Sequence, residues 1–106
     1  MLYRNCKAMW FFMDSEVGTQ PCEVRFDRKE IVVAFHGTSE YDATTWRGKE
    51  QGKGHYHLRA DDGYGEAALH QFEGGGFLDG YWEEEDREGV RGRGMIRIEM
   101  GETEKS

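Results

Sequence analysis

Three of the four histidines in this chain have a spacing that could place them around one metal ion. His55 and His57 are two residues apart, so on a β-strand both side chains point to the same face. Pairing with a neighbouring strand would bring His70 beside His55. Three imidazoles can hold zinc and leave one position for water, which would support metal-assisted hydrolysis. The alternative, which we favour, is a polar outer stripe without a metal, so no cofactor is expected.

A second set of residues has the chemistry of a small-molecule pocket. Aromatic rings and one carboxylate fall near one end of the expected strands, under connecting segments that carry Tyr41 and Tyr64. The face of an aromatic ring attracts cations, so this set predicts a pocket for a small, partly apolar or cationic ligand. The candidate ligand-binding residues are Phe12, Phe35, Thr44, Trp46, Trp82 and Glu84. The alternative is that the aromatic side chains simply fill the interior of the fold.

Acidic side chains outnumber basic ones, 21 against 14, and the formal net charge is −7. This is the wrong sign for binding a phosphate backbone, so we expect no direct contact with nucleic acid. An acidic surface can instead occupy a basic groove of a nucleic-acid-handling enzyme, as phage-encoded anti-defence inhibitors do. The candidate acidic surface consists of Asp61, Asp62, Glu83, Glu85 and Asp86, with Glu84 and Glu88 beside them. Solubility alone is the simpler explanation of such a surface.

Methionine and aromatic residues also gather on the expected outer face. Met9, Phe11 and Met13 are two residues apart in turn, so on a strand they form one stripe. If the last strand pairs with the first, Tyr81 and Met95 approach this stripe. Such residues are enriched in interface cores, so the stripe predicts a homodimer or a surface for a protein partner. The alternative is that the N-terminal strand crosses the fold and is covered within the same chain.

Short runs of aromatic and β-branched residues, separated by turn-forming residues, must position all of these side chains. The chain has 15 glycines and one proline, and helical spacing of apolar residues is hard to find. The expected strands are Tyr3–Met13, Cys22–Asp27, Glu30–His36, Ala43–Gly48, His55–Ala60, Glu66–Phe72, Phe77–Glu85 and Arg93–Met100. Their short connectors predict hairpins between consecutive strands. We expect one β-barrel domain over residues 1–100 and a polar, disordered tail at 101–106.

The register of the expected strands keeps apolar residues on one face. Pairing Phe26 with Ile31 also sets Val24 against Val33, and Val33 then lies near Trp46. A second row aligns Tyr56, Leu69, Gly80 and Ile96. The predicted inner face is Trp10, Phe12, Val24, Phe26, Ile31, Val33, Phe35, Trp46, Tyr56, Leu58, Ala67, Leu69, Leu78, Trp82, Ile96 and Ile98. Eight strands with one apolar face predict an all-β fold, a single antiparallel up-and-down eight-stranded β-barrel.

The opposite face of the same strands carries mostly complementary polar pairs. The register places His70 between His55 and Asp79, and it places Asp79 beside Arg97. It therefore predicts a polar row across four neighbouring strands.

Four segments in the C-terminal half have the alternating pattern of small barrels: Gly54–Leu58, Ala67–Leu69, Leu78–Trp82 and Met95–Ile98. They resemble strands of the calycin group, which includes lipocalins, fatty-acid-binding proteins and avidins. The Gly-x-Trp motif that precedes the first lipocalin strand is absent. The resemblance therefore implies a calycin-like fold and assigns no ligand or binding residue.

The remaining features favour an intracellular, non-enzymatic protein. Two cysteines, Cys6 and Cys22, are too few for a secreted disulfide scaffold, and the expected pairing leaves them too far apart for a disulfide. No apolar run approaches the roughly 20 residues that span a bilayer. Nucleophile, phosphate-loop and dinucleotide motifs are missing. We expect a cytoplasmic binding or interaction module whose partner is a small molecule or a protein, with no membrane contact.

Overall fold

The computed structural model describes residues 1–12, 17–71, 75–85, 88–89 and 91–104, and for residues 12, 17, 91, 103 and 104 it describes the backbone alone. The strands are β1 (Leu2–Phe12), β2 (Val17–Asp27), β3 (Glu30–Phe35), β4 (Thr44–Gly52), β5 (His55–Ala60), β6 (Gly65–His70), β7 (Phe77–Glu85), β8 (Arg91–Glu99) and β9 (Glu102–Glu104). In the part of the chain so described, no helix has the length and apolar character that a membrane crossing needs.

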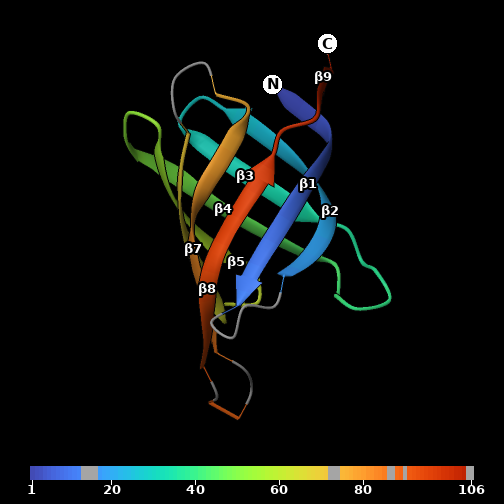
Figure 1. Ribbon diagram of the computed structural model, residues 1–106. Coiled ribbons are helices and arrows are strands. Elements are labelled where there is room, and N and C mark those ends of the chain that lie inside the picture. Colours follow the sequence, from blue (N-terminus) through green and yellow to red (C-terminus); the bar gives the residue numbers. More distant parts are fainter. Residues whose placement is uncertain (13–16, 72–74, 86–87, 90, 105–106) are drawn as a thin grey trace.

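Eight of these strands close into a barrel. Each strand from β2 to β7 pairs antiparallel with the next, β8 pairs with β1, and β1 pairs with β2 to complete the ring (Figure 1). Closure pairs the main-chain groups of every strand on both sides and leaves the apolar face inside. The predicted all-β, antiparallel, up-and-down eight-stranded barrel is confirmed.

The predicted register is also confirmed. Phe26 pairs with Ile31, Val24 with Val33, and Val33 with Trp46. The second row is present as well, with Tyr56, Leu69, Gly80 and Ile96 paired in turn. On the outer face His55 pairs with His70, His70 with Asp79, and Asp79 with Arg97. Alternation of apolar and polar residues was therefore sufficient to align these strands.

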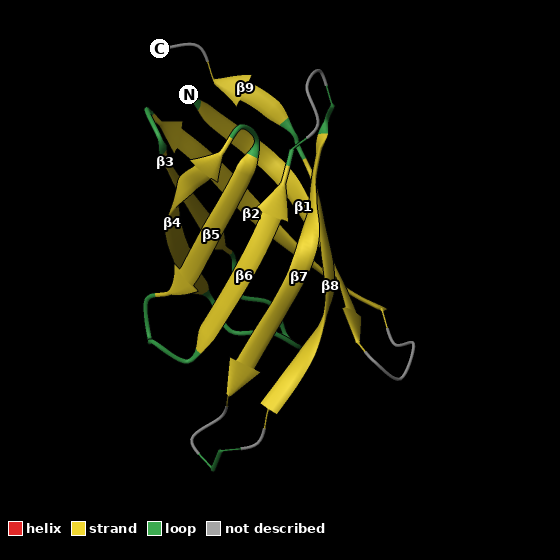
Figure 2. Ribbon diagram, turned by 90° about the vertical axis from the view of Figure 1, so that its left-hand side faces the viewer, coloured by secondary structure: helices red, strands yellow, loops and turns green. Residues whose placement is uncertain are grey.

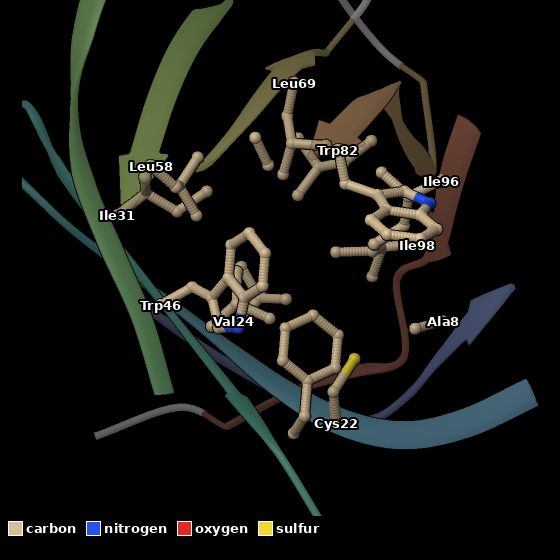
Figure 3. Close-up of a cluster of buried hydrophobic side chains, with 14 of the residues drawn as sticks. Ala8, Cys22, Val24, Ile31, Trp46, Leu58, Leu69, Trp82, Ile96 and Ile98 are labelled. Carbon is tan, nitrogen blue, oxygen red and sulfur yellow. The ribbon is translucent and has the colours of Figure 1, made fainter. Parts of the chain in front are cut away.

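The interior is a packed apolar core (Figure 3). Thirteen residues of the predicted inner face are buried: Trp10, Val24, Ile31, Val33, Phe35, Trp46, Leu58, Ala67, Leu69, Leu78, Trp82, Ile96 and Ile98. Phe26 and Tyr56 are partly buried and pack against them. The side chain of Phe12 lies outside the described part. Small residues that the sequence analysis did not place, Cys6, Ala8, Cys22 and Ala60, complete the core.

Strand β2 begins at Val17 rather than at the expected Cys22. Its first residues pair with β1, from Phe11 opposite Val17 to Lys7 opposite Pro21. The proline lacks an N–H, but its carbonyl accepts a hydrogen bond from the backbone of His36 at 2.9 Å. Barrel closure therefore makes a strand of a segment whose composition is typical of a turn.

Residues Glu102–Glu104, which lie in the expected disordered tail, form strand β9. Residues of β9 pair with Leu2, Tyr3 and Arg4 of β1, beyond the stretch that β8 covers (Figure 2). The start of β1 would otherwise present unpaired main-chain groups on that side. A polar segment can fill this position because β-pairing uses the main chain.

The two cysteines lie directly opposite each other, and the expectation that they are far apart is wrong. Because β2 begins at Val17, its pairing with β1 continues without a shift from Phe11 opposite Val17 to Cys6 opposite Cys22, and the β-bulge at Asn5, whose φ is 56°, follows this pair. Both residues are buried free thiols, and burial raises the pKa of each. The expectation failed because the strand was expected to begin at Cys22, so its pairing with β1 through residues 17–21 was not considered.

Candidate functional site

One end of the barrel, which we call the mouth, carries a pocket of about 350 Å³. At this end β1, β3, β5 and β7 finish and β2, β4, β6 and β8 begin. The pocket is lined by Trp10, Gln20, Glu40, Tyr41, Asp42, Thr44, Asp62, Trp82 and Glu84. These residues come from four strands, the β3–β4 loop and the β5–β6 turn, so only barrel closure brings them together.

Two tryptophans form the floor of the pocket. The rings of Trp10 and Trp82 meet edge to face with centroids 5.5 Å apart. Behind them Trp10 packs on Phe35 at 5.1 Å and on Trp46 at 6.2 Å. The indole Nε1 of Trp82 donates a hydrogen bond to the carbonyl of Met95 at 3.1 Å. The floor is thus held by the core and by the strand backbone.

Gln20 is the buried polar residue that organises the mouth. It is only 2% exposed, and its Oε1 accepts a hydrogen bond from Nε1 of Trp10 at 3.2 Å. Its Nε2 donates to the carbonyls of His36, at 2.9 Å, and Asp42, at 3.1 Å. One amide therefore connects the floor of the pocket to both ends of the β3–β4 loop.

Tyr41 covers the wall beside β2. A side-chain carbon added to Gly18 would lie 1.8 Å from the phenol oxygen of Tyr41, so this ring packs on bare backbone. The loop that carries Tyr41 is closed by a hydrogen bond from the Thr38 N–H to the Tyr41 carbonyl at 2.7 Å. The Thr38 hydroxyl in turn accepts from the Tyr41 N–H at 3.0 Å. The aromatic wall is therefore built into the loop.

Four carboxylates surround the aromatic surface. Glu40, Asp42, Asp62 and Glu84 line the pocket, and its described lining contains no lysine or arginine. Glu84 as a whole residue is exposed, but protein atoms crowd its carboxyl group. This burial, and secondly the negative charge of Asp62, raise the pKa of Glu84. The floor of the pocket is therefore aromatic, and the side chains that surround this floor are negatively charged.

The predicted ligand-binding residues are only partly brought together. Thr44, Trp82 and Glu84 line the pocket, whereas Phe35 and Trp46 lie beneath its floor in the core. Phe12 has no described side chain. Tyr41 was expected on a segment over the pocket and does line it, whereas Trp10, Gln20, Glu40 and Asp42 were not predicted as lining residues and Asp62 was predicted only on the acidic surface. The sequence signal that could have identified these lining residues is a connector that carries a tyrosine between two acidic residues.

The acidic surface forms a second, shallower groove of about 220 Å³ next to the pocket. Its lining is Gly63, Tyr64, Glu66, Glu83, Glu84 and Glu85. Asp61 lies at the same end but is held by the guanidinium of Arg47 at 2.8 Å. Asp86 lies outside the described residues. Most of the predicted acidic residues therefore do share one end of the barrel.

The apolar stripe lies across β1, β8 and β7. Phe11 and Tyr81 both pair with Met95, and Met9 is one pair further along β1. Met95 and Tyr81 are 64% and 63% exposed, while Met9 and Phe11 are half-buried. Met13 lies outside the described residues. The stripe is present, and its exposed part is centred on β7 and β8.

The three candidate histidines do not gather into one group. The Nδ1 atoms of His55 and His70 are 3.2 Å apart. Nε2 of His57 instead lies 3.9 Å from the Glu66 carboxylate. Asp79 is bonded to Arg97 at 2.6 Å. Within the described residues no set of three histidine, cysteine or acidic side chains is arranged to hold a metal ion.

Comparison with known proteins assigns no relative. The closed eight-stranded antiparallel barrel is compatible with a calycin-like fold. No protein-family model, curated protein or solved structure matches this chain.

Proposed function

We propose that this protein is a non-enzymatic, calycin-like binding module that holds a small organic cation at the mouth of its barrel. The observation that carries the proposal is the pocket in which the tryptophan floor and Tyr41 face four carboxylates. Its volume of about 350 Å³ falls in the usual range of small-molecule sites. The ligand would be a quaternary or protonated amine with an apolar surface.

The chemistry of the wall favours a cation over a neutral ligand. Electron-rich faces of Trp10, Trp82 and Tyr41 attract a positive charge, most strongly when it is poorly hydrated. The carboxylates of Asp62 and Glu84 repel each other, and a bound cation would relieve that repulsion. A deep apolar ligand is not favoured, because tryptophan and phenylalanine rings already fill the barrel interior.

Choline and its neutral isostere 3,3-dimethylbutan-1-ol test the proposal. The two probes have nearly the same shape, so only charge distinguishes them. Titration followed by tryptophan indole N–H resonances should shift the signals of Trp10 and Trp82 with choline and leave them in place with the alcohol. Replacing Trp82 with leucine should abolish the choline response. Equal binding of both probes, or no response to choline, would overturn the proposal.

The acidic groove supports a second candidate, an inhibitor that occupies a basic groove of a nucleic-acid-handling enzyme. Glu66 and Glu83 are direct cross-strand partners, and Glu85 extends the row. Arg59 pairs with Glu66 at 2.8 Å, and the carboxylates of Glu83 and Glu85 give the groove a negative charge that is complementary to a basic surface. Inhibition of a nuclease that falls steeply with added salt, and that is lost on Glu83→Gln with Glu85→Gln, would favour this candidate. Choline binding without inhibition of the nuclease would favour the first.

A further inference from the structure

We propose that His55 and His70 form a two-imidazole binding site for a first-row divalent transition metal such as Zn²⁺. The pair lies on the outer face of β5 and β6, which run side by side (Figure 2). It is at the end of these strands away from the mouth, because His55 begins β5 and His70 ends β6. The site is therefore separate from the pocket of the proposed function.

The distance between the two ring nitrogens matches that of two ligands on one metal ion. The Nδ1 atoms are 3.2 Å apart and the ring centroids 4.2 Å apart. Zinc–nitrogen bonds of about 2.0–2.1 Å at a tetrahedral angle require a nitrogen–nitrogen separation of about 3.3 Å. With both rings neutral, one Nδ1 must donate and the other accept. A metal ion bound to both Nδ1 atoms would take the place of that shared proton, and the donor ring would then carry its hydrogen on Nε2 instead.

The backbone holds both rings in place before any metal binds. His55 and His70 are direct cross-strand partners, which fixes the spacing of their Cβ atoms. The β4–β5 turn flanks them. A side-chain carbon on Gly54, whose φ is 77°, would lie 3.6 Å from Cε1 of His70. The Gln71 N–H also bonds to the Gly54 carbonyl at 2.8 Å, so the turn is tied to the end of β6.

Neighbouring side chains are engaged elsewhere, which limits the protein's contribution to two ligands. His57 faces Glu66, and the Asp79 carboxylate is bonded to Arg97. Water would complete the coordination. Imidazole nitrogen favours Zn²⁺, Ni²⁺ and Cu²⁺ over Mg²⁺ and Ca²⁺, which prefer oxygen. The exposed position of His55 lacks the dry surroundings that metal-assisted catalysis uses, so the site binds a metal without hydrolysing a substrate.

Zinc titration of the full chain, followed by the imidazole resonances of its four histidines, tests this site. We expect one equivalent of Zn²⁺ to shift the signals of His55 and His70, and Mg²⁺ at the same concentration to shift none. His55→Ala and His70→Ala should each weaken zinc binding at least about tenfold, because one imidazole alone cannot chelate. His57→Ala is the matched control, since it lies on the same strand and face, and it should bind zinc as the unmodified protein does.

Three results would overturn the proposal. They are equal zinc shifts at His36 and His57, undiminished zinc binding by His55→Ala, and no shift at His55 or His70 with several equivalents of Zn²⁺. The first and third results are measured on the unmodified protein, so they do not require any variant to fold. Near-ultraviolet circular dichroism of the tryptophan cluster would show that the alanine variants keep the barrel.

Discussion

The indole Nε1 of Trp10 donates a hydrogen bond to Oε1 of Gln20 at 3.2 Å, across the pair of strands that closes the barrel. The same glutamine amide donates to the carbonyls of His36 and Asp42. Closure of the barrel and the shape of the mouth loop are thus coupled through one side chain. A ligand that rests on Trp10 would be sensitive to every group in this network.

Replacing Gln20 with leucine should destabilise the barrel by about 1–3 kcal/mol, because the buried indole N–H of Trp10 would lose its partner. The mouth loop should loosen as well, and choline binding should weaken with it. Urea unfolding measures the first effect and choline titration the second. Gln51→Leu, at an exposed position of β4, is the control and should change stability by less than about 0.5 kcal/mol. Equal effects of the two substitutions would contradict the role given to Gln20.

Replacing Gly80 with alanine should destabilise the protein by more than about 2 kcal/mol. Its added carbon would lie 1.7 Å from the carbonyl oxygen of Ala68 on the adjacent strand, so the backbone itself must move. Gly76→Ala is the matched control, because no atom lies within 4 Å of the carbon it would add. Thermal or urea unfolding of the two variants compares them directly. If Gly80→Ala leaves the stability unchanged, the two strands approach each other less closely at this position than described.

Glu84→Gln should raise stability at neutral pH while it weakens choline binding. Burial and the charge of Asp62 raise the pKa of Glu84, so its ionised form is less favourable in the folded protein than in the unfolded chain. Stability should therefore fall as the pH rises from the ordinary glutamate pKa through the raised one, and this slope should shrink in the variant. Choline affinity should change in the opposite direction, because the ionised carboxyl attracts the cation.

Glu83→Gln is the control for this pair of effects, since Glu83 faces the outer groove and does not line the pocket. It should leave the pH dependence of choline binding unchanged. The decisive result is whether Glu84→Gln changes stability and choline affinity in opposite directions. Loss of binding together with loss of stability would point to a structural role for Glu84.

The exposed methionine and tyrosine side chains on β7 and β8 predict a homodimer at micromolar concentration. Met95 and Tyr81 are neighbours across this strand pair, and Met9 and Phe11 extend the same apolar surface. Met95→Lys should shift the sedimentation coefficient to that of a monomer, because a buried charge at the interface centre is costly. Tyr64→Ser, an exposed aromatic at the mouth, should leave association unchanged. A monomeric unmodified protein would rule out this use of the stripe.

Most of the barrel could be derived from the order of the residues. Alternation is a local property, and in a closed barrel it reports burial directly, since every strand has one inner and one outer face. That is why the pairing of Phe26 with Ile31 and of Leu69 with Gly80 followed from the pattern alone. The acidic end of the barrel followed for the same reason, because Asp62 and Glu83 lie at strand ends that antiparallel pairing brings together.

The pocket and the thiol pair, in contrast, were decided by tertiary structure. Cys6 lies opposite Cys22 because β2 extends back to Val17, through a segment whose composition is typical of a turn. Gln20 is polar and looks like part of a turn, yet barrel closure buries it and makes it the support of the mouth loop. Alternation along the chain establishes which strand faces are apolar. Long-range hydrogen bonds decide which polar side chains can be buried against those faces. A buried donor or acceptor is tolerated only where a group from a distant segment forms a hydrogen bond with it.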